Sequence, residues 1–185
     1  MKRGVALALC LLGTATVARA AGFDLTAAER TAILKAHNDE RALAKTPPVA
    51  KPLVALKWSA ALADTARKWA AGCQYQHNAG RNKTKGFTYV GENLFATTAS
   101  YGVKLLSDAV AAWSSEKKDF TYGPLSPSNY MFAAHYTQVI WSDTTEVGCA
   151  YAKCAPPAPS FLKTYVVCNY GPAGNWMGMA PYKKK

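Results

Sequence analysis

The spacing of apolar residues changes along this 185-residue chain from a helical period to the two-residue period of a strand. Helical spacing is found from Thr26 to about Lys45, from Ser59 to about Cys73, and from Gly102 to about Lys118. Alternation begins at Val147, and residues 164–170 are rich in β-branched and aromatic residues. A short strand is expected near 88–95. Helices first and strands last predict an α+β fold, with helices on both faces of a small antiparallel sheet.

The first 20 residues are typical of a secretory signal peptide. Lys2 and Arg3 precede an apolar run, and Ala18-Arg19-Ala20 is a small-x-small cleavage pattern. The apolar run is too short for a membrane anchor, and no later segment has the roughly 20 apolar residues that a span needs. We therefore expect residues 21–185 to form one domain, with its core at about 26–181. The expected location is extracellular, or periplasmic in a Gram-negative bacterium.

Four cysteines remain after the signal peptide: Cys73, Cys149, Cys154 and Cys168. An even number in an exported chain predicts disulfides, although spacing alone does not choose among three connectivities. No second cysteine pair stands at zinc-finger spacing. Removing the signal peptide lowers the formal charge from +11 to +8, spread along the chain. This balance favours an anionic cell surface as partner; we expect a monomer, and no nucleic acid.

One carboxylate interrupts an apolar stripe. Val110 and Trp113 lie on the buried face of the third predicted helix, and Glu116 is next in that series. A buried carboxylate needs a partner because an unpaired buried charge is costly. His77, Glu92 and His135 are the other candidates, but spacing alone cannot bring the four together. His37, one turn after Ile33, is interpreted as a helix-packing histidine.

Several ordered motifs resemble those of the CAP superfamily, which groups cysteine-rich secretory proteins, insect antigen 5 and plant pathogenesis-related proteins. The segments AHYTQVIWSDT (134–144) and YVVCNYGPAGNW (165–176) resemble its two signatures. KWSAALADTARKWA (57–70), CQYQHN (73–78) and GENLF (91–95) match its pattern in the expected order. The resemblance covers essentially the whole mature chain.

This resemblance implies a three-layer α-β-α sandwich with a central cleft lined by His77, Glu92, Glu116 and His135. It also implies disulfides between Cys73 and Cys154 and between Cys149 and Cys168.

Imidazole and carboxylate groups are good ligands for zinc and related divalent ions, so the four side chains predict a metal-binding cleft. Two alternatives stay open. The four could form a metal-free structural cluster, or they could act as acid and base in a metal-dependent or acid-base hydrolase. No serine or cysteine nucleophile stands in a recognisable motif, so covalent hydrolysis is not supported. We expect a protein that acts by binding, with hydrolysis as the alternative.

The segment from Thr121 to Ala133 is expected to be a loop rich in proline, serine and aromatic residues. Some members of the family bind sterols or fatty acids through this region or through a groove between helices, which makes lipid or sterol binding a second expectation. The candidate side chains are Phe120, Tyr122, Tyr130 and Phe132. The family's frequent place in defence and virulence suggests interaction with another organism's surface. Asn82-Lys83-Thr84 is an acceptable glycosylation sequon in a eukaryotic host.

Overall fold

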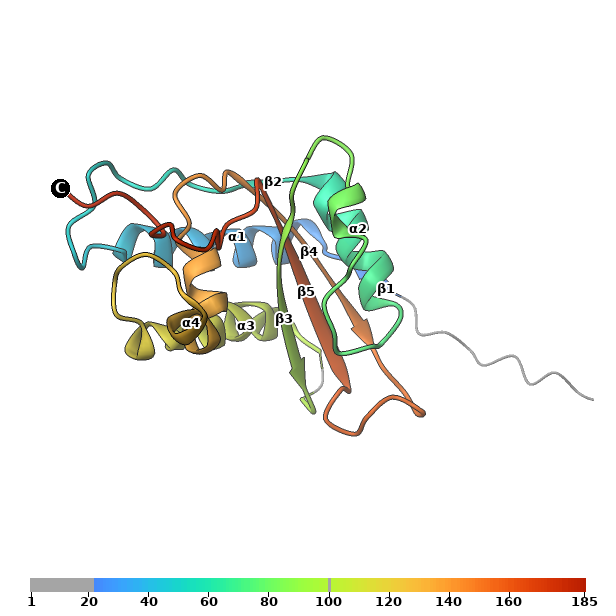
Figure 1. The fold of residues 1–185 in the computed structure, drawn as a ribbon. Helices are drawn as coiled ribbons and strands as arrows, with labels where there is room; N and C mark the ends of the chain where they lie inside the picture. The colour runs from blue at the N-terminus through green and yellow to red at the C-terminus, as the bar shows by residue number, and fades with distance from the viewer. Residues whose placement is uncertain (1–21, 100) are drawn as a thin grey trace, which may run out of the picture.

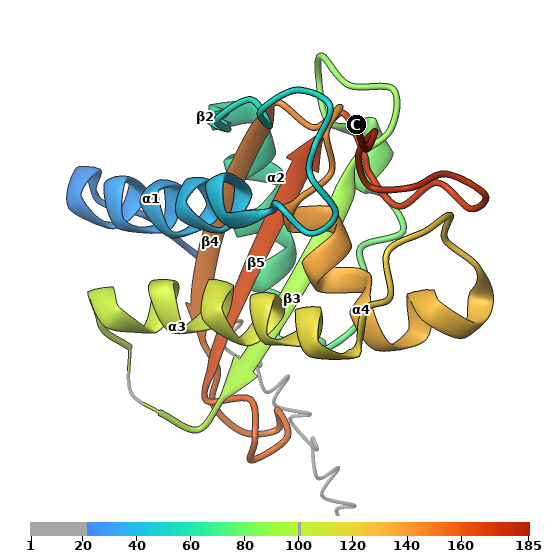
Figure 2. The same cartoon turned by 90° about the vertical axis from the view of Figure 1, so that its left-hand side faces the viewer.

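The computed structural model describes residues 22–99 and 101–185, and the predicted signal peptide lies outside these residues. A five-stranded sheet stands between two layers of helices (Figure 1). Helices α1 (Ala27–Leu43), α3 (Val103–Ser115) and α4 (Pro127–Val139) lie on one side, and α2 (Ala60–Ala70) lies on the other. Figure 2, turned by 90°, shows α1 and α3 crossing in front of the strands with α2 behind. The predicted three-layer α+β sandwich is confirmed.

The strands are β1 (Gly22–Asp24), β2 (Lys57–Trp58), β3 (Gly91–Thr97), β4 (Glu146–Lys153) and β5 (Thr164–Gly171). The main path runs β1-β4-β5-β3 and is antiparallel throughout. The two-residue β2 pairs with β4 in parallel. Every residue of β5 is buried, because it has strands on both edges and helices on both faces. β3 is an edge strand, and this position matters for the site.

The sequence before α1 explains where this helix begins. Thr26 caps α1: its side chain accepts the Glu29 backbone N–H, and the Glu29 carboxylate accepts the Thr26 backbone N–H at 2.7 Å.

Helix α2 packs close to β4 at Gly148, where a Cβ would lie 2.2 Å from the Ala63 backbone nitrogen. Only glycine therefore allows this approach.

Two expectations are corrected. Residues 127–133 belong to α4 and not to a loop, so the expected loop shrinks to a short connection. Ser126 caps this helix and Pro127 occupies its first turn, where proline has no hydrogen bond to lose. Ala133 has non-helical angles (φ −143°, ψ 17°) and divides α4 just before the His135 turn. The second correction concerns Cys73, which lies three residues beyond the end of α2 with φ 48°.

Both disulfides join the pairs that the family resemblance implied. Cys149 and Cys168 face each other across β4 and β5, with a Cα–Cα distance of 4.1 Å. Cys73 and Cys154 tie the segment after α2 to the end of β4, at 5.8 Å. None of the described helices is long and apolar enough to cross a membrane.

Candidate functional site

The first histidine and glutamate pair lies beside α2. His77 Nδ1 is 2.9 Å from Glu92 Oε1, which also accepts the Asn78 backbone N–H at 2.8 Å. Asn169, in the amide orientation that satisfies its neighbours, donates to Glu92 Oε2 at 3.1 Å. The Glu92 side chain is fully buried, whereas 55% of the His77 side chain is exposed. The buried carboxylate is fully hydrogen-bonded, and it holds a solvent-facing imidazole.

The second pair joins α4 to the 3₁₀ helix Glu116–Asp119 that continues α3. His135 Nδ1 is 2.6 Å from Glu116 Oε1, and Glu116 Oε2 accepts the backbone N–H groups of His135 and Tyr136 at 2.9 and 3.1 Å. The His135 ring also stacks at 6.3 Å on Trp113. The partner that the sequence demanded for Glu116 is therefore His135.

The two pairs lie on opposite faces of β3. Leu94 packs with the core under α2, and Phe95 packs with the core under α1 and α3. Because side chains alternate along a strand, Glu92 shares the α2 face with Leu94. Asn93 shares the other face, where its amide donates to the His135 carbonyl at 3.1 Å. In residues 22–99 and 101–185, no three or more His, Cys, Asp or Glu side chains are grouped to hold a metal ion.

Both histidines are held in the same tautomer. A carboxylate can only accept, so each Nδ1 carries the proton and donates it to glutamate. In the neutral imidazole each Nε2 is then an acceptor, and neither Nε2 has a hydrogen-bond partner in the described part of the chain. Metal-ligating histidines commonly donate their other N–H to a carboxylate in this way. The donor chemistry of each pair is therefore that of an imidazole metal ligand oriented by a glutamate.

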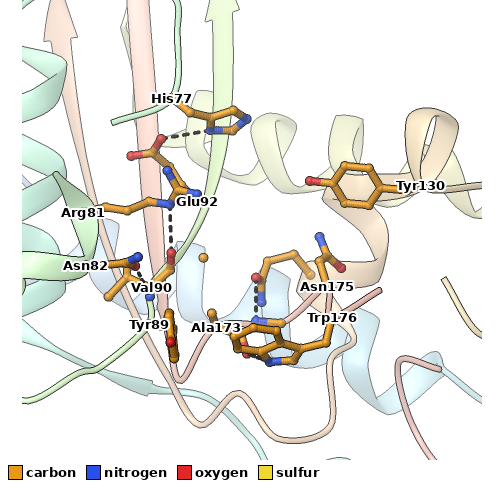
Figure 3. Close-up of a pocket in the computed structure, with 13 residues that line it drawn as sticks. His77, Arg81, Asn82, Tyr89, Val90, Glu92, Tyr130, Ala173, Asn175 and Trp176 are labelled. Atoms are coloured by element: carbon orange, nitrogen blue, oxygen red, sulfur yellow. Dashed lines mark hydrogen bonds and ion pairs between the residues drawn. The ribbon is translucent and has the colours of Figure 1, made fainter. Parts of the chain in front are cut away.

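A cleft of about 250 Å³ opens beside the first pair (Figure 3). His77 and Glu92 line it, whereas Glu116 and His135 do not. Tyr130 reaches in from α4, opposite His77. The remaining lining residues come from the segment before β3, the start of β3, α4 and the segment after β5; they are Arg81, Asn82, Tyr89, Val90, Gly91, Gln138, Ala173, Gly174, Asn175 and Trp176.

Sequence reasoning missed Arg81, Tyr89 and Trp176 as cleft residues. Arg81 is fixed by donating from Nε to the Val90 carbonyl and from Nη1 to the Asn78 carbonyl, both at 2.9 Å. The rings of Tyr89 and Trp176 meet at right angles, with centroids 5.1 Å apart. Trp176 stands inside the quoted signature segment, but no spacing rule points its ring at Tyr89, 87 positions earlier in the chain.

The four lipid candidates lie in different surroundings. Tyr130 lines the cleft. Phe120 packs edge-on against Tyr136, with ring centroids 6.0 Å apart. Tyr122 donates to the Tyr182 carbonyl and packs on its ring. Phe132 is 61% exposed on α4. The four therefore do not form one apolar surface.

A buried network that the sequence did not reveal supports the second pair. Arg41 donates to the carbonyls of Val54, Val139, Trp141 and Thr144, at 2.8 to 3.1 Å, and so fixes the end of α4. A cation at a helix C-terminus is favoured by the helix dipole. Burial lowers the pKa of Arg41 to about 10.

The third histidine is confirmed as a packing residue. His37 is fully buried; its Nδ1 donates to the Ile33 carbonyl and its Nε2 accepts the Tyr170 hydroxyl, both at 2.8 Å. Burial lowers its pKa from 6.5 to about 4, with a smaller contribution from nearby Arg41. This imidazole is neutral at physiological pH and has no nitrogen left for a ligand.

Comparisons with known proteins agree on one family. A model of the cysteine-rich secretory protein family, CAP, matches residues 34–170. Venom allergen 5 of Vespa velutina is 36% identical over 96% of this chain and 93% of its own length. Cysteine-rich secretory protein 3 of Equus caballus is 35% identical over 82% of this chain, which spans 60% of that protein. The crystal structure of NaASP2 with Zn²⁺ matches with a TM-score of 0.75 at 28% identity, covering 88% of each chain.

Proposed function

Because the chain belongs to the cysteine-rich secretory protein (CAP) family, we propose that it is a secreted protein that acts by binding, with a divalent metal ion held by His77 and His135. One observation carries the metal proposal: in both histidines Nδ1 donates to a glutamate, and Nε2 has no hydrogen-bond partner among residues 22–99 and 101–185. The glutamates hold the rings and leave the ring nitrogens as ligands. A bound zinc ion would supply positive charge and open coordination positions for oxygen groups of a ligand. NaASP2, which has the same fold, was crystallised with Zn²⁺.

Zinc titration by calorimetry tests this proposal. We expect one-to-one binding to the wild-type mature protein and its loss in both His77→Ala and His135→Ala. Tyr130→Phe, which changes a cleft residue that is not a proposed ligand, serves as the matched control and should bind normally. Near-UV circular dichroism shows whether each variant is folded. Zinc binding that survives in the double histidine variant would overturn the proposal, and loss in only one single variant would show that the histidines do not share an ion.

Binding is favoured over hydrolysis by the state of the carboxylates. A general base needs a free oxygen within hydrogen-bond reach of the water that it activates. Both oxygens of Glu92 and both oxygens of Glu116 already accept hydrogen bonds from the protein. The carboxylates therefore serve first to orient the two imidazoles, which is the arrangement of a metal ligand.

Lipid or sterol binding is a second candidate, supported by exposed apolar side chains on the first half of α4. Met131 is 73% exposed and Phe132 61% exposed. A titration with neutral phosphatidylcholine vesicles containing sterol should show binding that Phe132→Ser weakens and that added salt leaves unchanged. Binding that requires anionic phosphatidylserine in the vesicles and disappears at high salt would instead indicate an anionic cell surface recognised by the basic charge of the chain.

A further inference from the structure

The cleft beside His77 has one cationic group without an acidic partner. Two hydrogen bonds from Nε and Nη1 to backbone carbonyls fix the Arg81 guanidinium, and within the described residues neither a hydrogen bond nor an ion pair engages its Nη2. Glu92 is the only carboxylate among the lining residues, and its oxygens are taken by His77, Asn78 and Asn169. Arg81 therefore has a charged donor group left for a ligand, and its planar guanidinium favours a ligand with carboxylate geometry.

Two large aromatic side chains also line the cleft. Tyr89 is 52% exposed and Trp176 is 41% exposed, so both rings are accessible to a ligand. The Trp176 indole N–H donates to the Ala173 carbonyl at 3.2 Å, so the ring offers its apolar surface to a ligand. An aromatic face is electron-rich and attracts C–H groups that carry partial positive charge. A saturated ring with polarised C–H bonds fits such a wall.

Polar groups surround these two features. Asn82 accepts the Val90 backbone N–H through Oδ1, which leaves its amide Nδ2 as a donor. In the described part of the chain, the hydroxyls of Tyr89 and Tyr130 and the Nε2 of His77 have no hydrogen-bond partner. The cleft thus presents donors and acceptors around an aromatic surface, a combination that suits hydroxyl groups on a ring.

Size limits the ligand further. Sites for drug-sized molecules have volumes of about 300 to 1,000 Å³. A cleft of about 250 Å³ is smaller and accepts one ring with its substituents.

We propose that this cleft binds an acidic sugar residue, with the sugar ring against Tyr89 and Trp176 and its carboxylate on Arg81. The inference deepens the proposed binding function, since it assigns a ligand class to the same cleft, but it requires no metal. His77 is common to both sites, so a bound metal would add a second contact for the sugar.

The test compares methyl β-glucuronide with methyl β-glucoside, which differ only in a carboxylate against a hydroxymethyl group. Each is titrated into the chelator-treated mature protein and followed by NMR chemical shifts. A hydrogen-bonded charge pair predicts that the glucuronide binds about tenfold more tightly or better. Arg81→Gln should remove this difference, and Trp176→Ala should weaken both sugars. Lys83→Gln removes an equal charge from the same turn but outside the cleft, and should change nothing.

The outcomes separate this inference from the metal proposal. Arg81→Lys keeps the charge without the planar fork, so a reduced glucuronide preference in this folded variant supports carboxylate recognition. Equal binding of the two sugars, or a preference that survives in Arg81→Gln, would overturn the inference. So would binding of an acidic peptide by a protein that binds neither sugar. If zinc binds through His77 and His135 but neither sugar binds, the metal proposal stands and the acidic-sugar inference fails. If the glucuronide binds but zinc does not, the acidic-sugar inference stands and the metal proposal fails.

Discussion

The two histidine and glutamate pairs make the same contacts in different surroundings. In each pair the histidine Nδ1 donates to a glutamate oxygen, and the glutamate also accepts a nearby backbone N–H. Glu92 is fully buried while His77 is mostly exposed, whereas Glu116 and His135 are 25% and 31% exposed. In the first pair a buried glutamate thus holds a histidine ring that faces the cleft. In the second pair both the glutamate and the histidine are partly buried. The same hydrogen bonds therefore leave the histidine more exposed to solvent in the first pair than in the second, on the other face of β3.

Removing the Cys73–Cys154 disulfide should have the largest effect, and it should affect the first pair more than the second. This bond closes 81 residues and holds Cys73 four positions before His77. Replacing both cysteines by serine is expected to cost about 4 kcal/mol of unfolding free energy on loop entropy. The segment carrying His77 should loosen while the His135 turn stays in place. Urea unfolding measures the first effect; amide hydrogen exchange at Asn78 against His135 measures the second.

The other disulfide provides the control. Cys149–Cys168 closes only 19 residues inside the sheet, so the matching double serine variant should cost about 3 kcal/mol. It should leave the exchange of Asn78 unchanged relative to His135. Equal loosening of Asn78 in both variants would show that the Cys73–Cys154 disulfide has no special role in placing His77.

This contrast between the pairs could be predicted only in part from the sequence. Periodicity located α1, α2, α3, β4 and β5, because each buries a regular apolar pattern. The apolar stripe that ends at Glu116 correctly predicted that this carboxylate has a partner, but the pattern alone did not identify His135 as that partner. The disulfide pairing came from the family resemblance, since cysteine spacing permits three connectivities.

The remaining features depend on tertiary contacts or on signals that were overlooked. Ser126 followed by Pro127 is a helix start that could have revealed α4. The strands β1 and β2 have three and two residues, too short for any periodicity. Arg41 looks like a surface charge in the sequence, and only the convergence of carbonyls from distant segments buries it. For the same reason, no local pattern indicated that Arg81 and Trp176 share a cleft.

His37 gives a reference histidine without a carboxylate partner, and its burial predicts acid sensitivity. Its pKa is about 4 in the folded protein and 6.5 ordinarily, so the unfolded chain binds a proton first as pH falls. Its contribution to stability is complete above pH 6.5 and is lost between pH 6.5 and 4, by about 3 kcal/mol. Urea unfolding at intervals across this range measures the slope. His37→Gln lowers stability at neutral pH but should flatten this part of the profile; an unchanged slope would assign it to other groups.

The two glutamates should differ in their effect on stability. Glu92→Ala leaves the Asn78 N–H and the Asn169 amide without an acceptor in a buried place, at a cost of about 2 kcal/mol. Glu116→Ala should cost about 1 kcal/mol, because Glu116 is partly exposed and water can reach the N–H groups of His135 and Tyr136. Urea midpoints at pH 7 give the comparison. Equal losses would mean that the difference in burial has no energetic weight.

The histidines should show the smallest effects, and in the reverse order. His135→Ala removes a ring that stacks on Trp113 and bonds to Glu116, and is expected to cost about 1 kcal/mol. His77→Ala removes a mostly exposed ring, and Glu92 keeps the Asn78 and Asn169 donors, so the cost should stay within about 0.5 kcal/mol. Thermal unfolding of the chelator-treated variants measures both, because bound metal would add its own stabilisation. A larger loss for His77→Ala would make that ring a structural element; the expected order leaves it free to serve a ligand.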